Sequence, residues 1–378
     1  MAIYLDYAAA TPVDEDVLAA MQPFFTRQFY NPSAIYEPAV AVSKALGAAR
    51  AEIADVLGAK STEIIFTAGG TEANNLAIHG VMQSYPKANA VLSAIEHDSV
   101  REPALQYETA VLKVGTDGLV DPASIEHAVN SQTVLVSVMY VNNEIGTVQP
   151  IRRIATELQK IKAKRQKAGN ETPLYFHVDA AQAGNYLDLH VHRLGADLLT
   201  INGGKLYGPK QVGVLFVRSG VVLKPLINGG GQERNLRSGT ENVAGAVGLA
   251  AALKQSSDMR HVEIGRLKSL QKQLIDGLKK EFPSMVINGS LKHRLPNNLH
   301  VTLPGTDNER VLMQLDNEGI YAAAGSACSA SSEEPSHVLK AIGVGEAGIK
   351  SSLRFSMGRQ TTPEDISYTV LTLKRLLA

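Results

Sequence analysis

Cysteine, net charge and long apolar runs are all scarce in this chain of 378 residues. A single cysteine cannot form an internal disulfide, so nothing in the composition indicates an oxidising compartment. The 37 basic side chains balance 37 acidic ones, which leaves no charge excess of the kind that binds nucleic acid or a membrane surface. No uninterrupted apolar run approaches the roughly 20 residues that a membrane-spanning helix needs.

The first residues also lack the pattern of an export signal. The segment Met1–Asp6 has no basic flank and no apolar core, so we expect no signal peptide and a cytoplasmic protein. Hydrophobic residues at 44% and charged residues at 20% are typical of a globular protein. The length suits two domains, or one large domain with an appendage.

Short apolar strands alternate with helical patterns between residues 60 and 220. Continuous apolar strands separated by helices predict a mostly parallel α/β sheet with both faces covered. In such sheets ligands bind outside the carboxyl ends of the strands, so the residues that follow each strand are candidates for chemistry. The expected strands are Glu63–Thr67, Ala90–Ala94, Val134–Val141, Leu174–Val178, Leu198–Ile201 and Val212–Val217, with helices at Thr71–Tyr85 and Ile151–Ala168.

The pattern changes near residue 258. We expect a long amphipathic helix at about Met259–Phe282 as the connector to a second unit. After it, strands and helices alternate at wider spacing, which predicts a smaller α+β domain. A cap, a proline and an acidic first turn at Thr362–Asp365 predict the start of the last helix.

The only cysteine, Cys328, lies in a segment of glycine, serine and alanine at residues 322–332. Such a segment cannot bury much apolar surface and is typical of an exposed, mobile loop. A thiol on such a loop is placed to react rather than to pack. A chance surface cysteine explains this pattern equally well, so the rest of the chain has to decide.

Two glycines precede the predicted helix after the first strand, in the segment Phe66–Thr71. Free backbone N–H groups and the helix dipole make such a turn an anion site. No lysine follows the second glycine, which excludes a P-loop. A glycine turn with a threonine cap is an equally good alternative.

Three polar residues follow other predicted strands. His97 could stack on a planar cofactor or move protons, although a structural histidine explains it as well. Asp179 could be a metal ligand or the partner of a cationic ring nitrogen, but no second acidic or histidine cluster supports a metal. Lys205 is a candidate for a Schiff base, because burial favours its nucleophilic amine. Together, Lys205 and Asp179 form the arrangement that pyridoxal phosphate requires.

Two arginine-bearing segments could bind anionic groups. The glycine-rich loop Gly229–Thr240 contains two arginines and suits a phosphate or a carboxylate. Arg354 is flanked by alternating apolar residues and either faces solvent or clamps a carboxylate.

With these residues in place, the chain resembles the cysteine desulfurases, in the NifS/IscS-like branch of the class V, fold-type I pyridoxal phosphate enzymes. The resemblance implies a mainly parallel seven-stranded sheet in a large domain at residues 14–257. It also implies a smaller α+β domain, made of residues 1–13 and 258–378, that carries the cysteine loop. The matching blocks, in order, are Tyr4–Pro12, Asn31–Ser33, Phe66–Asn75, Glu96–His97, Val141–Gly146, His177–Gln182, Lys205–Lys210, Gly229–Thr240, Gly325–Cys328 and Leu353–Gly358.

The resemblance implies roles around the cofactor ring. Lys205 would hold pyridoxal phosphate as a Schiff base and move protons at the substrate Cα. Asp179 would pair with the ring nitrogen, and His97 would stack on the ring and assist proton transfer. Gln182 would hydrogen-bond the phenolic oxygen, with Asn143 near it.

Further roles concern the anionic groups of cofactor and substrate. Gly70 and Thr71 would bind the phosphate at the helix start, and Thr240 would reach the phosphate of the partner subunit in a homodimer. Arg354, with Asn143 nearby, would clamp the substrate carboxylate.

The sulfur chemistry would fall to Cys328. Its thiolate would attack the sulfur of L-cysteine, leaving a persulfide on the enzyme and releasing alanine. The sulfur would then pass to an iron–sulfur scaffold or another acceptor protein, or to tRNA thiolation, with no direct nucleic-acid or membrane partner. No resident metal is expected, although Cys328 could transiently ligate an iron–sulfur cluster. The alternatives are an aminotransferase or lyase of the same fold acting on another amino acid, and a non-catalytic scaffold.

One departure from the family pattern concerns the phosphate. Relatives usually read Ser-x-His before the lysine, whereas this chain has Asn202-Gly203-Gly204. Asn202 can replace the serine as a hydrogen-bond donor, but Gly204 has no side chain. Because a hydrogen bond to a charged group is worth about 1.5–3 kcal/mol, and backbone N–H groups recover only part of it, we expect looser cofactor binding than in typical relatives.

Overall fold

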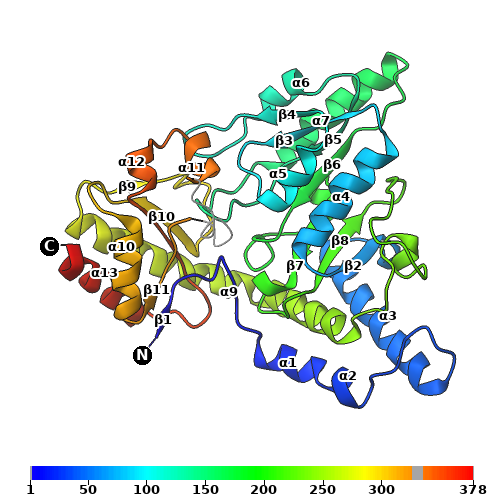
Figure 1. The fold of residues 1–378 in the computed structure, drawn as a ribbon, viewed down its shortest axis with the longest axis horizontal. Coiled ribbons are helices and arrows are strands. Elements are labelled where there is room, and N and C mark those ends of the chain that lie inside the picture. The colour runs from blue at the N-terminus through cyan, green and yellow to red at the C-terminus, as the bar shows by residue number, and fades with distance from the viewer. Residues whose placement is uncertain (1, 326–334, 378) are drawn as a thin grey trace.

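The computed structural model describes residues 2–325 and 335–377, which contain a seven-stranded, a three-stranded and a two-stranded sheet (Figure 1). The strand order of the large sheet is β2-β8-β7-β6-β5-β3-β4. Its strands are β2 (Ile64–Thr67), β3 (Asn89–Ser93), β4 (Thr109–Leu112), β5 (Thr133–Ser137), β6 (Tyr175–Asp179), β7 (Leu198–Asn202) and β8 (Gly213–Val217).

The large sheet is mainly parallel, as expected. The pairs β3–β4, β3–β5, β5–β6 and β6–β7 are parallel, while β8 is antiparallel to both β2 and β7. Since β8 opposes both neighbours, it alone runs against the other six strands. The carboxyl ends of those six strands therefore meet at one edge of the sheet.

Helices cover both faces of this sheet, which explains why its strands are apolar throughout. Consecutive residues point to opposite faces: Leu198 packs in the cluster that contains α4 (Gly70–Ser84), and Leu199 packs in the cluster that contains α3 (Glu37–Leu57). The first face is also covered by α5 (Asp98–Ala104), and the second by α7 (Ile151–Lys167) and part of α9 (Val243–Glu281).

The large sheet differs from the expectation at two strands. Strand β4 was not among the expected strands, because it is an edge strand whose residues are partly exposed and so lacks the continuous burial of its neighbours. The strand expected at Val134–Val141 ends at Ser137 as β5. Beyond it, the N–H groups of Val138 and Tyr140 bond to the carbonyls of His177 and Asp179 outside a regular ladder.

The carboxyl-terminal part forms the smaller sheets, packed with helices α10 (Asn308–Asn317) and α13 (Pro363–Leu377). Strand β10 (Asn298–Thr302) pairs antiparallel with β9 (Val286–Ile287) and β12 (Ser352–Ser356). The first strand of the chain, β1 (Ile3–Tyr4), pairs with β11 (Ile320–Tyr321). The short helices α11 (His337–Ala341) and α12 (Glu346–Ile349) lie on the side toward the large sheet (Figure 1).

Helix α9 joins the two parts and begins earlier than expected. The sequence pattern placed its start at about Met259, but the helix begins at Val243, because its first half is apolar all round rather than amphipathic. Gly248 packs against Met21 of α1 (Glu15–Met21), and Gly277 packs against Val370 of α13. The domain boundary expected between residues 257 and 258 thus falls inside one continuous helix, and the domain division stays a prediction. Within the described ranges, no helix is long and apolar enough to cross a membrane.

Two buried histidines make the fold sensitive to acid. Burial lowers the pKa of His177 to about 4 and the pKa of His300 to about 3. His177 is held between Ser137 and Thr200, with ring-nitrogen distances of 2.8 and 3.1 Å to their hydroxyl oxygens. In the unfolded chain a histidine has a pKa near 6.5, so the unfolded state binds more protons below that pH.

We therefore predict that the free energy of unfolding rises with pH between about 4 and 6.5. Each buried histidine contributes up to about 1.4 kcal/mol per pH unit in this window. Denaturant unfolding across this range should show a smaller slope for His177→Gln than for the unaltered protein. The exposed His127→Gln is the matched control and should keep the full slope, and an unchanged slope in His177→Gln would contradict this account.

Candidate active site

A cleft of about 100 Å³ lies beyond the carboxyl ends of the parallel strands. A cavity of about 370 Å³ adjoins it and shares Ala9, Gly70, Thr71, Asn202 and Lys205 with it. The cleft brings together nine residues that the sequence singled out: Gly70, Thr71, His97, Asn143, Asp179, Gln182, Asn202, Lys205 and Arg354.

The amino terminus of α4 opens onto both cavities. Its N-cap is Gly69, with φ at +114°, and within the described residues no side chain caps it. Thr71 is exposed, so the alternative of a threonine cap is wrong. A side chain at Gly213 of β8 would lie 2.7 Å from the Gly69 carbonyl carbon, so this turn needs glycine for close approach. The free N–H groups and the helix dipole favour an anion here.

Asp179 is buried at the end of β6 and is held by neutral donors. The Nδ2 of Asn74 donates to its Oδ2 at 2.8 Å, and the N–H of Ala181 donates to its Oδ1 at 2.9 Å. The same Asn74 amide also donates to the hydroxyl oxygen of Ser99 at 2.8 Å. Asn74 was missed in the sequence because its role depends on α4 packing against β6, although it lies one turn after the glycine pair.

His97 is linked to this network through Ser99. The N–H of Ser99 donates to Nδ1 of His97 at 3.0 Å, and the Ser99 hydroxyl lies 2.8 Å from the same nitrogen. Because a backbone N–H can only donate, Nδ1 is an acceptor and the neutral ring carries its proton on Nε2. In this tautomer Nε2 is a donor, so Nε2 can accept a proton only after a change of tautomer.

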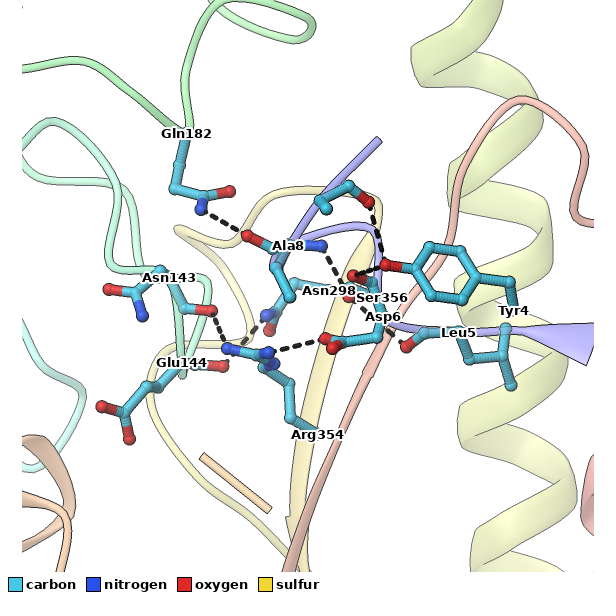
Figure 2. A network of polar contacts seen from close by, with 12 residues as sticks. Tyr4, Leu5, Asp6, Ala8, Asn143, Glu144, Gln182, Asn298, Arg354 and Ser356 are labelled. Atoms are coloured by element: carbon cyan, nitrogen blue, oxygen red, sulfur yellow. Dashed lines mark hydrogen bonds and ion pairs between the residues drawn. The ribbon is translucent and has the colours of Figure 1, made fainter. Parts of the chain in front are cut away.

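Lys205 projects into the cleft from a short 3₁₀ turn, Gly203–Lys205, that follows β7 directly. Its Nζ donates to the carbonyl oxygens of Ala8, at 2.8 Å, and Ala9. The Nε2 of Gln182 donates to the Ala8 carbonyl as well, at 2.9 Å (Figure 2). Lys205 and Gln182 thus meet at one point of the amino-terminal segment.

Arg354 of β12 reaches the cleft from the small sheet and is almost fully buried. Its Nη2 forms an ion pair with Oδ1 of Asp6 at 2.6 Å, and its Nη1 donates to the carbonyl of Asn143 at 3.1 Å (Figure 2). Its Nε is buried without a partner among the described residues. Arg354 therefore faces inward, as the carboxylate-clamp interpretation requires, and Asp6 is a second residue that the sequence did not single out.

The segment that contains Cys328 lies outside the described residues, but its flanks are bonded to Arg354, which lines the cleft, and to Glu144, the neighbour of Asn143. Ala323 and Arg354 exchange two backbone hydrogen bonds, of 2.6 and 3.2 Å. On the other side, the Ser336 hydroxyl donates to Oε2 of Glu144 at 2.6 Å. Glu144 follows Asn143 in the chain, and its burial raises its pKa while Ser336 and Arg354 oppose the rise.

Two predicted site residues lie away from this cleft. Thr240 is exposed and lines a different cavity with Arg237 and Gln211, so its proposed contact with a partner subunit stays a prediction. Gly204 lines only the adjoining cavity, and its carbonyl accepts hydrogen bonds from the N–H and hydroxyl of Thr11 at 3.1 and 3.2 Å. No group of three or more metal-ligating side chains occurs in the part of the chain that the structure describes.

This arrangement can be compared with known proteins. The family model of class-V aminotransferases matches residues 3–369. The chain belongs to the class-V aminotransferase family. It is 43% identical over 382 residues to a cysteine desulfurase IscS of Dictyoglomus turgidum, covering 99% of this chain and 94% of that protein. It is 42% identical over 372 residues to a cysteine desulfurase IscS of Methanosarcina thermophila, covering 97% and 89%.

Solved structures place this class-V protein in the same branch. A NifS-like protein matches it with a TM-score of 0.91 at 30% identity, covering 100% of this chain and 99% of that one. A NifS-like protein from Rickettsia africae matches with a TM-score of 0.89 at 32% identity, with the same coverage. These relatives confirm the expected family, the cysteine desulfurases of the NifS/IscS branch, and its fold.

The family depends on pyridoxal phosphate, and the residues present fit that cofactor. The α4 terminus offers N–H groups to a phosphate. Among the described residues buried Asp179 accepts only from neutral donors, which suits a protonated ring nitrogen. Lys205 lines both cavities, where it can reach an aldehyde carbon. Buried Asn74 leaves its Oδ1 without a partner among the described residues, at the wall of the cleft.

We predict that Asn74→Ala weakens cofactor binding about tenfold, since it removes a hydrogen bond to the Asp179 carboxylate. Equilibrium titration of the cofactor-free protein with pyridoxal phosphate, followed by absorbance, measures this. The matched control is Asn75→Ala, because Asn75 bonds two backbone carbonyls, those of Thr71 at 2.9 Å and Ser99 at 3.4 Å, rather than the Asp179 carboxylate, and should keep the affinity. Equal affinities for Asn74→Ala and the unaltered protein would refute the role given to Asn74.

Proposed function

We propose that this pyridoxal phosphate-dependent cysteine desulfurase moves the sulfur of L-cysteine onto Cys328, releases L-alanine and passes the sulfur to an acceptor. The observation that carries the proposal is the meeting of three groups in one cleft. Lys205 can move a proton, Asp179 can pair with a ring nitrogen, and Arg354 can bind a carboxylate. The flanks of the Cys328 segment are bonded to Arg354 of this cleft and to Glu144, the neighbour of the cleft residue Asn143.

The cofactor, when bound, withdraws electrons from the substrate Cα. Asp179 would keep the ring nitrogen protonated, and Asn74 holds Asp179 in place. Gly70 and Thr71 would hold the phosphate, His97 would hold the ring, and Gln182 would donate to its phenolic oxygen.

Arg354 positions the amino acid. Its Nε is available for a substrate carboxylate, while its two other nitrogens stay on Asp6 and the Asn143 carbonyl. The Asn143 side chain lines the cleft beside it. Lys205 would take a proton from the substrate Cα and later return one. Because the Ala8 and Ala9 carbonyls accept from its ammonium, they hold the protonated form in reach.

The sulfur step is a transfer between two thiols. The Cys328 thiolate attacks the substrate sulfur, an S–S bond forms as the C–S bond breaks, and the electron pair of that bond goes to the substrate carbon, which gains a proton. Overall, one thiol and cysteine give one persulfide and alanine, without an external oxidant or reductant. The role agrees with the sequence around the thiol, which consists of glycine, serine and alanine rather than large apolar residues.

The proposal extends to the sulfur acceptor, the dimer and the two domains. The sulfur acceptor is a protein of iron–sulfur assembly or of tRNA thiolation, and a persulfide carried on Cys328 is what such an acceptor thiol attacks. The enzyme is a cytoplasmic homodimer in which Thr240 contacts the phosphate of the partner subunit. Two domains, at residues 14–257 and at residues 1–13 with 258–378, face each other across the cleft.

We predict that Cys328→Ser abolishes sulfide release from L-cysteine in the presence of a reducing thiol, because the serine hydroxyl cannot accept sulfur. The bound-cofactor absorbance should persist and still change when L-cysteine is added. Lys205→Ala is the contrasting variant and should lose both signals. Surviving sulfide release in Cys328→Ser would overturn the role of the thiol and favour a lyase or an aminotransferase of the same fold.

We predict that Gly204→His tightens the cofactor about tenfold, since it restores a hydrogen bond to a charged phosphate. The substitution fits, because a Cβ at this position would lie 3.4 Å from Cγ of Lys210, an ordinary contact. The dissociation constant for pyridoxal phosphate measures the effect, with Gly204→Ala as the control for the loss of glycine itself. No tightening relative to Gly204→Ala would show that Gly204 does not weaken the site.

A further inference from the structure

The cavity beside the α4 terminus is widened by the missing side chain at Gly204. Its walls include Gly69, Gly70, Asn202, Gly204 and Lys210. The Oδ1 of Asn202 accepts from the N–H of Gly204 at 3.3 Å, so this end of the amide is occupied. Its Nδ2 lies near Gly70, 3.5 Å from where a Cβ there would stand. This wall therefore offers Nδ2 and one cation to an anion.

Lys210 is held over Gly204 by the loop that follows Lys205. The Gly203 N–H donates to the Val212 carbonyl at 3.0 Å, and the Gly208 N–H donates to the Gly203 carbonyl at 3.1 Å. A side chain at Gly203 would stand 2.7 Å from the Pro209 carbonyl oxygen, so only glycine lets the loop lie this close.

Backbone strain holds the same loop in place. Tyr207 and Gln211 have φ values of +60° and +58°, a region that non-glycine residues seldom adopt. The strained residues lie on either side of Lys210, and the lysine Cγ comes to rest 3.4 Å from a Cβ position at Gly204. The aliphatic part of Lys210 thus takes up space beside the glycine.

The ammonium group of Lys210 forms no ion pair with a carboxylate of the described residues. No ion pair involves Lys210 in the ranges 2–325 and 335–377. The nearest acidic residue on α4, Glu72 in its first turn, is paired with Arg237 at 2.9 Å. Lys210 is exposed at the mouth of the cavity, where an ammonium on a long side chain can swing toward the α4 terminus.

We propose that Lys210 binds the phosphate of pyridoxal phosphate, as a cation that replaces the side-chain contact which Gly204 cannot make. The phosphate then lies between the α4 terminus and Lys210, with the Asn202 Nδ2 as a further donor. A lysine acts here as a point charge rather than as a directional partner, so it tolerates the wide cavity. The inference rests on the proposed placement of the phosphate at Gly70 and Thr71.

The test compares pyridoxal phosphate with pyridoxal, which lacks the phosphate. The cofactor-free full chain is titrated with each, and the ratio of the two dissociation constants isolates the contribution of the phosphate. Lys210→Met should reduce this ratio about tenfold by weakening pyridoxal phosphate alone, and added salt should then weaken binding less than in the unaltered protein. Lys210→Arg keeps the charge and should restore most of the ratio.

The matched control is Lys87→Met, at an exposed lysine beyond the opposite end of α4, which should leave the ratio unchanged. In the background of Gly204→His, the effect of Lys210→Met should shrink, since the histidine then shares the phosphate. An unchanged ratio in Lys210→Met, or an equal weakening of both compounds, overturns the proposal. If the unaltered protein itself does not prefer pyridoxal phosphate to pyridoxal, the placement of the phosphate at α4 fails as well.

Discussion

The site depends on a short amino-terminal segment, residues 3–11, that is bonded to both small sheets and to the residues that follow β7 of the large sheet. Ile3 and Tyr4 pair with β11, and the N–H of Ala8 donates to the Ser356 hydroxyl of β12 at 2.9 Å. On the other side, the carbonyl of Ala8 accepts from Lys205, and Thr11 binds Gly204. Each such bond contributes only about 0.5–1.5 kcal/mol, but together they fix the lysine of the large sheet relative to the arginine of the small one.

Buried charge within the cleft is matched group by group. Asp6 neutralises Arg354, which otherwise would be a lone buried cation, and Asn74 satisfies Asp179 with a neutral donor. The difference matters because Asp6 balances the charge of Arg354 but leaves its Nε without a partner among the described residues, whereas Asp179 keeps a negative charge for a cationic ring nitrogen. The cleft can therefore receive a carboxylate beside Arg354 and a cationic ring nitrogen beside Asp179. Lys205 lines the same cleft.

Local pattern was sufficient to find the strand ends, and with them Lys205, Asp179 and His97, because apolar strands and turn residues follow from neighbours in the sequence. It could not find β4, whose residues are half exposed, nor the early start of α9, where an apolar helix has no amphipathic face. Asn74 and Asp6 also escaped, since their partners lie more than one hundred positions away along the chain. The choice between a threonine cap and an open helix end likewise required the backbone around Gly69.

The continuity of α9 has a mechanical consequence for how the cleft could open. At a rise of 1.5 Å per residue, its 39 residues form a helix about 58 Å long that packs against Met21 near one end and Val370 near the other. Any rotation of the large sheet against the small sheets must bend this helix or slide along it. The pair Ser256–Ser257, about a third of the way along, is the kind of place where helices bend, yet Ser256 is buried and its hydroxyl donates to Asn185 at 2.8 Å. That hydrogen bond attaches the helix to the loop after β6, so a rigid helix restricts the movement of a loop next to the cleft.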